Sequence, residues 1–118
     1  MTQDQRLPAK TRKVRRRTAI DLHALSTRIA RREGHLPADE PAGYLDAFAV
    51  HLRVMARLCE NERDADSAGL KRLALATKPD APDAVRVLGH RRAVGALLTI
   101  VNLNAQREGI DPYGRPAS

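Results

Sequence analysis

The sequence predicts an all-α fold: a small bundle of about four helices with a disordered basic N-terminal arm. Apolar residues recur at the three- and four-residue intervals of helices, and no stretch alternates with the two-residue period of strands. These apolar residues are mainly Ala, Leu and Val, and only 3% of the chain is aromatic, which favours a compact aliphatic bundle. A length of 118 residues is enough for one such domain.

Residues 1–17 have no hydrophobic period and are predicted to form a disordered basic arm. A first helix is expected from Thr18, where three apolar residues begin to share one face, and Gly34 would end it. Those three residues are Leu22, Leu25 and Ile29. Extending this helix backwards would place Arg15 on its apolar side, so we expect order only from about residue 17.

Residues 35–41 contain two prolines and are expected to link the first helix to the second, with Asp39 as a candidate cap. The second helix, about residues 42–62, has the clearest apolar pattern in the chain. Its apolar residues form one narrow seam: Leu45, Phe48, Leu52, Met55 and Cys59. A third, shorter helix is expected over about residues 67–77.

The fourth helix is expected over about residues 82–108. Gly89 and Gly95 interrupt it, and each costs about 1 kcal/mol relative to alanine, which favours a bend or close packing there. Asn102 and Asn104 lie in its apolar stretch, where either burial or exposure is compatible with the pattern.

The chain therefore divides into three parts: an arm over residues 1–17, a helical domain over 18–109 and a C-terminal tail over 110–118. Gly109 is expected to cap the last helix of the domain. Within the tail, residues 111–114 are typical of a β-turn.

The net charge of +7 lies entirely in the first 34 residues, which hold ten Lys or Arg against three Asp or Glu. Residues 35–118 hold 11 basic and 11 acidic residues and are neutral. Such a polycationic segment is attracted to polyanions, most often nucleic acid. The candidate contact residues are Lys10, Arg12, Lys13, Arg15, Arg16, Arg17, Arg28, Arg31 and Arg32.

This pattern predicts a small non-enzymatic nucleic-acid-binding protein, accessory or regulatory, that contacts phosphates with weak sequence selectivity. Contact with six phosphates would give log affinity a slope of about −5 against log salt. Duplex DNA is favoured over single strands because only Tyr44, Phe48 and Tyr113 could stack on bases. A helix-turn-helix is disfavoured because Asp80 and Asp83, at the start of the expected recognition helix, would face phosphates.

The alternative is a helical protein-interaction module, such as an adaptor, an inhibitor or a complex subunit, whose basic arm docks an acidic partner. A homodimer through the second or fourth helix would double the contacts of either kind. A solvated arm that only aids solubility is a third interpretation. A membrane partner is not expected, because the arm has no Trp or Phe and no broad apolar face that could insert.

No catalytic, metal or cofactor site is expected. Cys59 continues the apolar seam of its helix, so a core cysteine is favoured over a nucleophile or a metal ligand. His51, Cys59 and Glu62 share one helix region but do not supply the four ligands of a zinc site, and His23, His35 and His90 occur singly. The acidic residues of 60–66 lack the glycine and terminal glutamate of an EF-hand loop. One cysteine suits a reducing compartment, and the Arg- and Ala-rich usage is typical of a GC-rich bacterial genome, so the bacterial cytoplasm is the predicted location.

Overall fold

The computed structural model describes residues 7–33 and 41–111, and within these residues it is all-α, as predicted. Its four helices are α1 (Ala9–Ala30), α2 (Tyr44–Asn61), α3 (Ser67–Ala76) and α4 (Ala84–Arg107). The last three begin and end within about two residues of the predicted bounds. No helix of the described part is long and apolar enough to cross a membrane.

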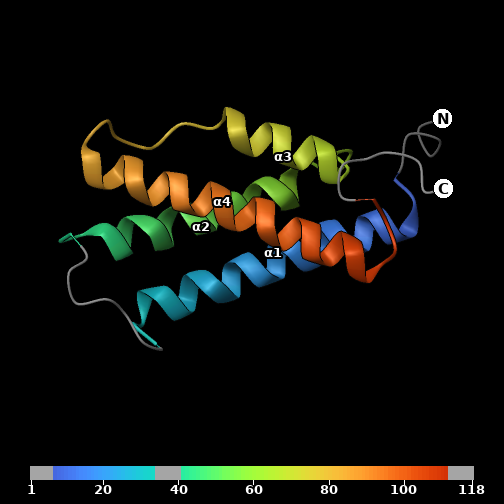
Figure 1. Cartoon of the computed structure of the whole chain (residues 1–118), viewed down its shortest axis with the longest axis horizontal. Coiled ribbons are helices and arrows are strands. Elements are labelled where there is room, and N and C mark those ends of the chain that lie inside the picture. Colours follow the sequence, from blue (N-terminus) through green and yellow to red (C-terminus); the bar gives the residue numbers. More distant parts are fainter. Residues whose placement is uncertain (1–6, 34–40, 112–118) are drawn as a thin grey trace.

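The helices pack side by side, with α4 between α1 and α3 and in front of α2 (Figure 1). Helix α1 is antiparallel to both α2 and α4. Its Ser26 hydroxyl donates to the carbonyl oxygen of Ala49 in α2 (2.7 Å), and Asn104 of α4 donates to the Thr18 hydroxyl (3.2 Å). Helix α3 is antiparallel to α4 in turn, since Lys71 near its start donates to Asn102 near the end of α4 (2.9 Å).

The core consists of the aliphatic faces on which the prediction was based. The seam of α2 is buried at Phe48, Leu52, Met55 and Cys59, whereas Leu45 is only half-buried. Facing it are Leu22 of α1, Leu70 of α3 and a row on α4: Val94, Leu97, Val101 and Ala105. The core is therefore shared by all four helices, with α2 and α4 at its centre.

The start of α1 corrects the predicted boundary of the disordered arm. The helix begins at Ala9 rather than Thr18, so residues 9–17 belong to the bundle; residues 1–6 lie outside the described part. Val14 is 1% exposed, and Arg15 donates from Nη1 to the carbonyl oxygen of Cys59 (2.7 Å) in the last turn of α2. Arg15, which was expected to prevent a longer helix, thus binds the Cys59 carbonyl, which has no partner within α2 because the helix ends there.

The end of α1 also differs from the prediction. The last helical residue is Ala30, and Arg32 adopts the left-handed conformation (φ 57°) that glycine usually takes at a helix end. The expected stop at Gly34, the linker with Asp39 and most of the β-turn over 111–114 lie outside the described residues. At the end of α4, Gly109 (φ 72°) is the cap, as expected.

The predicted close packing at Gly89 is confirmed, because α2 and α4 touch backbone to backbone there. A Cβ added at Gly89 would lie 2.7 Å from the Cβ and 2.8 Å from the carbonyl carbon of Ala47. At Gly95, by contrast, an added Cβ would meet no atom within 4 Å. The two glycines therefore have different roles: only the first is required by packing.

Candidate nucleic-acid interface

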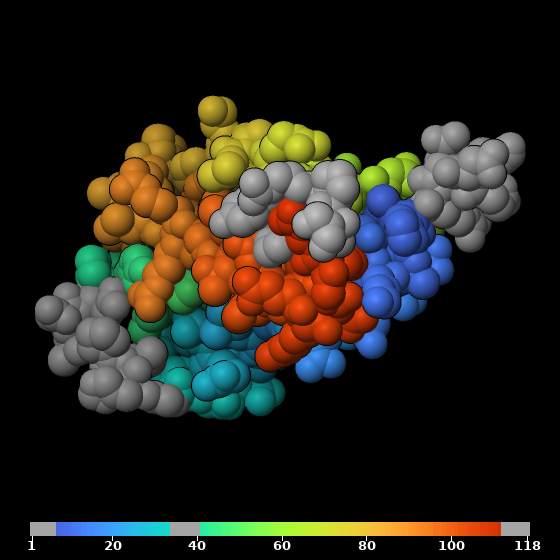
Figure 2. All heavy atoms as spheres, turned by 45° about the vertical axis from the view of Figure 1, so that its right-hand side comes forward, coloured from blue at the N-terminus to red at the C-terminus, as the bar shows by residue number. Residues whose placement is uncertain are grey.

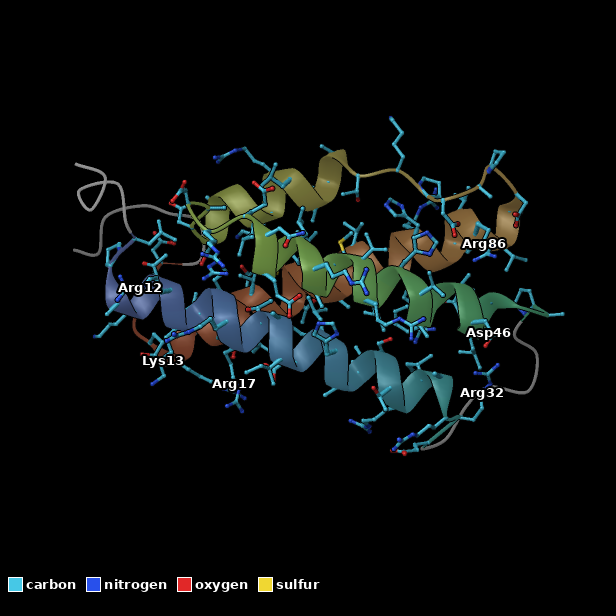
Figure 3. All side chains as sticks on the ribbon, turned by 180° about the vertical axis from the view of Figure 1, so that it is seen from behind. Arg12, Lys13, Arg17, Arg32, Asp46 and Arg86 are labelled. Atoms are coloured by element: carbon cyan, nitrogen blue, oxygen red, sulfur yellow. The ribbon has the colours of Figure 1, made fainter. Side chains whose placement is uncertain are left out.

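The outward face of α1 carries a row of basic side chains. Successive helical residues are about 100° apart, so positions opposite the buried Val14 and Leu22 form a stripe along the helix. Five exposed residues occupy this stripe: Lys10, Lys13, Arg17, Arg28 and Arg31. At 1.5 Å per residue they span about 32 Å from first to last. Figure 3 shows Lys13 and Arg17 on the same side of the helix.

Three residues of the stripe form weak ion pairs. Lys13 pairs with Glu108 (3.2 Å), Arg17 with Asp21 (3.4 Å) and Arg31 with Glu33 (3.9 Å). The basic side chains of these pairs are 61–70% exposed, so each pair stabilises the fold by about 1 kcal/mol at most and is screened by salt. A phosphate can displace such carboxylates at little cost.

Lys10, Arg16 and Arg28 are exposed and make no hydrogen bond or ion pair within residues 7–33 and 41–111. Arg16 lies between the stripe and the side of α1 that faces α2. Among the candidate residues from the sequence, these three side chains are the most available to a ligand.

The other three candidates from the sequence bind backbone carbonyls of helix ends. Arg15 donates to Cys59 and, at 3.4 Å, to Glu60, and Arg12 donates to the carbonyl oxygen of Leu7 (2.9 Å). Arg32 donates to the carbonyls of Ile29 and Ala30 and pairs with Asp46 of α2 (3.0 Å), which it faces in Figure 3. These contacts hold helix ends in place, so the three arginines are less available than the stripe.

A basic pocket of about 240 Å³ lies where the first half of α1 meets the end of α4; Figure 2 shows these two segments beside each other in blue and orange-red. Lys13, Arg17 and Arg107 line it, together with Glu108. At its base the buried Asn104 donates to Asp21 (3.1 Å) and accepts from Arg107 (3.4 Å). Sequence reasoning missed Arg107, because only the antiparallel packing of α1 on α4 brings it to the stripe.

The described aromatic residues cannot stack on bases. Tyr44 is 7% and Phe48 4% exposed, and Arg92 covers them, with its guanidinium carbon 4.8 Å from the centre of the Phe48 ring. Tyr113 lies outside the described residues. The described surface thus has exposed basic side chains but no stacking platform of the kind that binds single strands.

Helices α3 and α4 do not have helix-turn-helix geometry. They run antiparallel, whereas that motif joins two helices at roughly 90–120°. Two aspartates lie just before the first turn of α4: Asp83 caps the helix by accepting from the Arg86 amide (3.0 Å), and Asp80 pairs with the Arg86 side chain (3.3 Å). The basic residue of the first turn of α4 is therefore already paired with an acid.

The structure brings together two histidines that lie far apart in the sequence. His51, 1% exposed, donates from Nδ1 to the Ala47 carbonyl (2.7 Å) and accepts at Nε2 from the Asp80 amide (3.2 Å). The ring of His90 lies against it, 5.4 Å between centres. His90 Nε2 is 2.8 Å from the Thr77 hydroxyl, which ties the loop after α3 to α4. Within the described residues no group of three or more His, Cys, Asp or Glu could hold a metal ion.

Acid is expected to destabilise the protein through His90. Burial lowers the pKa of His90 below its ordinary value of 6.5, and His51 lowers it further, while Asp80 opposes them. The lowered pKa means that folding favours the neutral form of the His90 ring. The stability that this form contributes to the protein is fully present above about pH 6.5 and is lost as the pH falls below that value. Urea unfolding at pH 7.5 and pH 5 should therefore show a smaller acid-induced loss for His90→Gln than for the wild type. His23→Gln, which removes a partly exposed histidine paired with Glu60, is the control; an equal effect of both variants would contradict this assignment.

Cys59 is expected to be unreactive in the folded protein. It is fully buried, and burial raises the pKa of its thiol to about 12 despite the opposing charge of Arg15. Since the thiolate is the nucleophile, a thiol reagent at pH 8 should label Cys59 only after denaturant is added. Rapid labelling without denaturant would show that the core opens at the α2 seam.

No protein-family model matches the sequence, and no curated protein or solved structure is significantly similar to it. The basic face of α1 is therefore the feature from which a function can be inferred.

Proposed function

We propose that the chain is a small non-enzymatic nucleic-acid-binding protein, with an accessory or regulatory role, that holds duplex DNA by its phosphates along the outward face of α1. The observation that carries this proposal is the basic stripe from Lys10 to Arg31, on the side of α1 opposite the core. Helix formation from Ala9 onward places these charges on a folded element. Fewer conformations are then lost on binding than if the same charges lay on a disordered arm.

The length of the stripe supports a duplex as the ligand. Its span of about 32 Å is close to one turn of B-DNA, about 34 Å, so α1 lying along the duplex axis would bring its two ends to phosphates one turn apart. The absence of an exposed aromatic residue in the described part argues against single strands.

Weak sequence selectivity follows from the chemistry of the stripe. Lysine and arginine contacts to phosphates set the position of a protein on DNA but carry no direct sequence information. A base-reading helix presents polar side chains to a groove, whereas α4 is preceded by Asp80 and capped by Asp83, and Asp80 pairs with the Arg86 side chain of its first turn. Affinity should therefore depend strongly on salt and little on sequence.

Fluorescence anisotropy with a labelled 20-base-pair duplex, and with one of its strands alone, would test the proposal across a salt series. We expect tighter binding to the duplex, with a slope of log affinity against log salt of about −5 if six phosphates are engaged. Similar affinity for an unrelated duplex sequence is also expected. No duplex binding at low salt, together with binding to polyglutamate, would overturn the proposal in favour of a module that docks an acidic protein.

A further inference from the structure

The basic pocket between α1 and α4 brings cations from two helices around one hollow. Lys13 and Arg17 lie one turn apart on α1, and Arg107 lies in the last turn of α4. The pocket has a volume of about 240 Å³, which leaves room for a small polyatomic anion and some of its water. The buried Val14 and Asn104 also line it, so the hollow reaches down to the core.

A hydrogen-bond network holds the two arginines of this pocket in place. The Asn104 side chain is buried, and its amide oxygen accepts from Arg107 Nη1 (3.4 Å). Its amide nitrogen donates to Asp21 (3.1 Å), and Asp21 in turn pairs with Arg17 Nε (3.4 Å). One buried asparagine is therefore linked to both guanidinium groups. Side chains fixed in this way lose less conformational freedom when they bind a ligand.

Both arginines keep N–H groups that no described residue uses. Arg17 contacts Asp21 through Nε, which leaves its two Nη groups. Arg107 contacts Asn104 through Nη1, which leaves Nε and Nη2. Such neighbouring N–H groups of a guanidinium match two oxygens of one phosphate, in the bidentate geometry for which arginine is suited. The exposed ammonium group of Lys13 adds further donors at the rim of the pocket.

The charges around the pocket favour an anion as its ligand. Its three cations stand against two carboxylates, Glu108 in the lining and Asp21 at the base, which leaves a net charge of +1. One oxygen of Asp21 is bound to the buried asparagine, whereas Glu108 lies against the exposed Lys13, 3.2 Å from Nζ. An ion pair with so exposed a lysine is weak, so a phosphate oxygen can replace the Glu108 carboxylate there at little cost.

We propose that this pocket binds one phosphate group, to which Arg17 and Arg107 donate and on which Lys13 exchanges Glu108 for a phosphate oxygen. The group is either a backbone phosphate of a duplex or a free phosphate; the first source rests on the proposed function, whereas the second does not. A backbone phosphate held by two helices would fix the position of the duplex along the stripe, since phosphate contacts set register and orientation.

Inorganic phosphate tests the pocket without nucleic acid. Titration at constant ionic strength, followed by NMR of the arginine Nε–H groups at mildly acidic pH, should shift the signals of Arg17 and Arg107 in a saturable way. Arg107→Gln should weaken phosphate binding about tenfold or more, because it removes charge-assisted hydrogen bonds. Arg91→Gln, on an exposed turn of the same helix, is the matched control and should leave it unchanged. Shifts at Arg17 and Arg107 no larger than at Arg91 would overturn the proposal.

Glu108→Gln should tighten phosphate binding several-fold, because it removes the carboxylate that competes for Lys13. Asp46→Asn changes the net charge equally at the other end of α1, where Asp46 pairs with Arg32, and is the control. Equal tightening by both variants would mean that phosphate responds to net charge alone, which would overturn binding at this pocket.

A labelled duplex distinguishes the two sources of the phosphate. If the pocket binds a backbone phosphate, Arg107→Gln should weaken duplex binding and reduce the magnitude of the salt slope by about one, whereas Arg91→Gln should change both less. If the ligand is a free phosphate, Arg107→Gln should impair only the binding of inorganic phosphate.

The same measurements separate this site from the proposed function. A wild-type chain that binds inorganic phosphate but no duplex would overturn the proposed function and support the pocket. A chain that binds the duplex but shows no phosphate binding, and no effect of Arg107→Gln on the duplex, would overturn the pocket and leave the proposed function standing.

Discussion

Replacing Gly89 with alanine is expected to lower the free energy of unfolding by about 2–3 kcal/mol. The new methyl group would lie 2.7–2.8 Å from the Cβ and carbonyl carbon of Ala47 and the amide nitrogen of Phe48. Two of these three atoms belong to the backbone of α2, which cannot rotate away as a side chain can, so α2 and α4 would have to separate. The loss exceeds the gain of about 1 kcal/mol that alanine brings to a helix interior.

Gly95→Ala is the matched control on the same helix. Its methyl group meets no atom within 4 Å, so only the helix propensity acts, and stability should rise by about 0.5–1 kcal/mol. Thermal or urea unfolding followed by circular dichroism, at micromolar concentration to limit self-association, gives both values. A Gly89→Ala protein as stable as Gly95→Ala would show that α2 and α4 are not in backbone contact.

Replacing Lys10, Arg16 and Arg28 together with glutamine is expected to weaken binding to duplex DNA by tenfold or more near 100 mM salt. Each lost phosphate contact should reduce the magnitude of the salt slope by about one, so the triple variant should lose about three. These side chains are exposed and have no partner within the described residues. Their loss should leave the melting temperature nearly unchanged, which separates binding from folding.

The control for this variant removes the same charge from the far side of the bundle. Arg72, Lys78 and Arg91 lie on α3, on the loop after it and on α4; all three are exposed and likewise unpaired within the described residues. If the face of α1 binds the phosphates, glutamine at these positions should change affinity and salt slope much less. Equal losses for both triple variants would mean that binding follows net charge alone and that α1 is not the interface.

The composition of the candidate interface could be predicted only in part from the sequence. The basic residues of the stripe follow from their spacing, because 100° per residue places them opposite the leucines of α1. The roles of Arg15 and Arg32 could not be predicted from the sequence. The role of Arg15 depends on α2 ending beside it, and that of Arg32 depends on its left-handed conformation at the end of α1. Arg107 joins the stripe only through the packing of α4, and no local pattern marks it.

The histidine pair was inaccessible to sequence reasoning for the same reason. His51 and His90 are far apart in the chain, and each alone fits a helix surface as well as a core. Their contact requires α2 and α4 to approach as closely as Gly89 allows, and a loop that carries the Asp80 amide to His51. Asn104 is a similar case: its burial depends on partners, Thr18 and Asp21, that lie in α1.

The sequence by itself determined the all-α class, the bounds of α2, α3 and α4 and the location of the charge. These features depend on residues near one another in the chain: apolar spacing, glycine and proline breaks, and the sign of each side chain. Only the tertiary structure decided that α1 begins at Ala9 and that Gly89 is required. Both depend on contacts between distant helices. The hydrogen bond from Arg15 to a carbonyl at the end of α2 outweighs the tendency of the basic run to be disordered. The backbone contact between α2 and α4 outweighs the low helix propensity of Gly89.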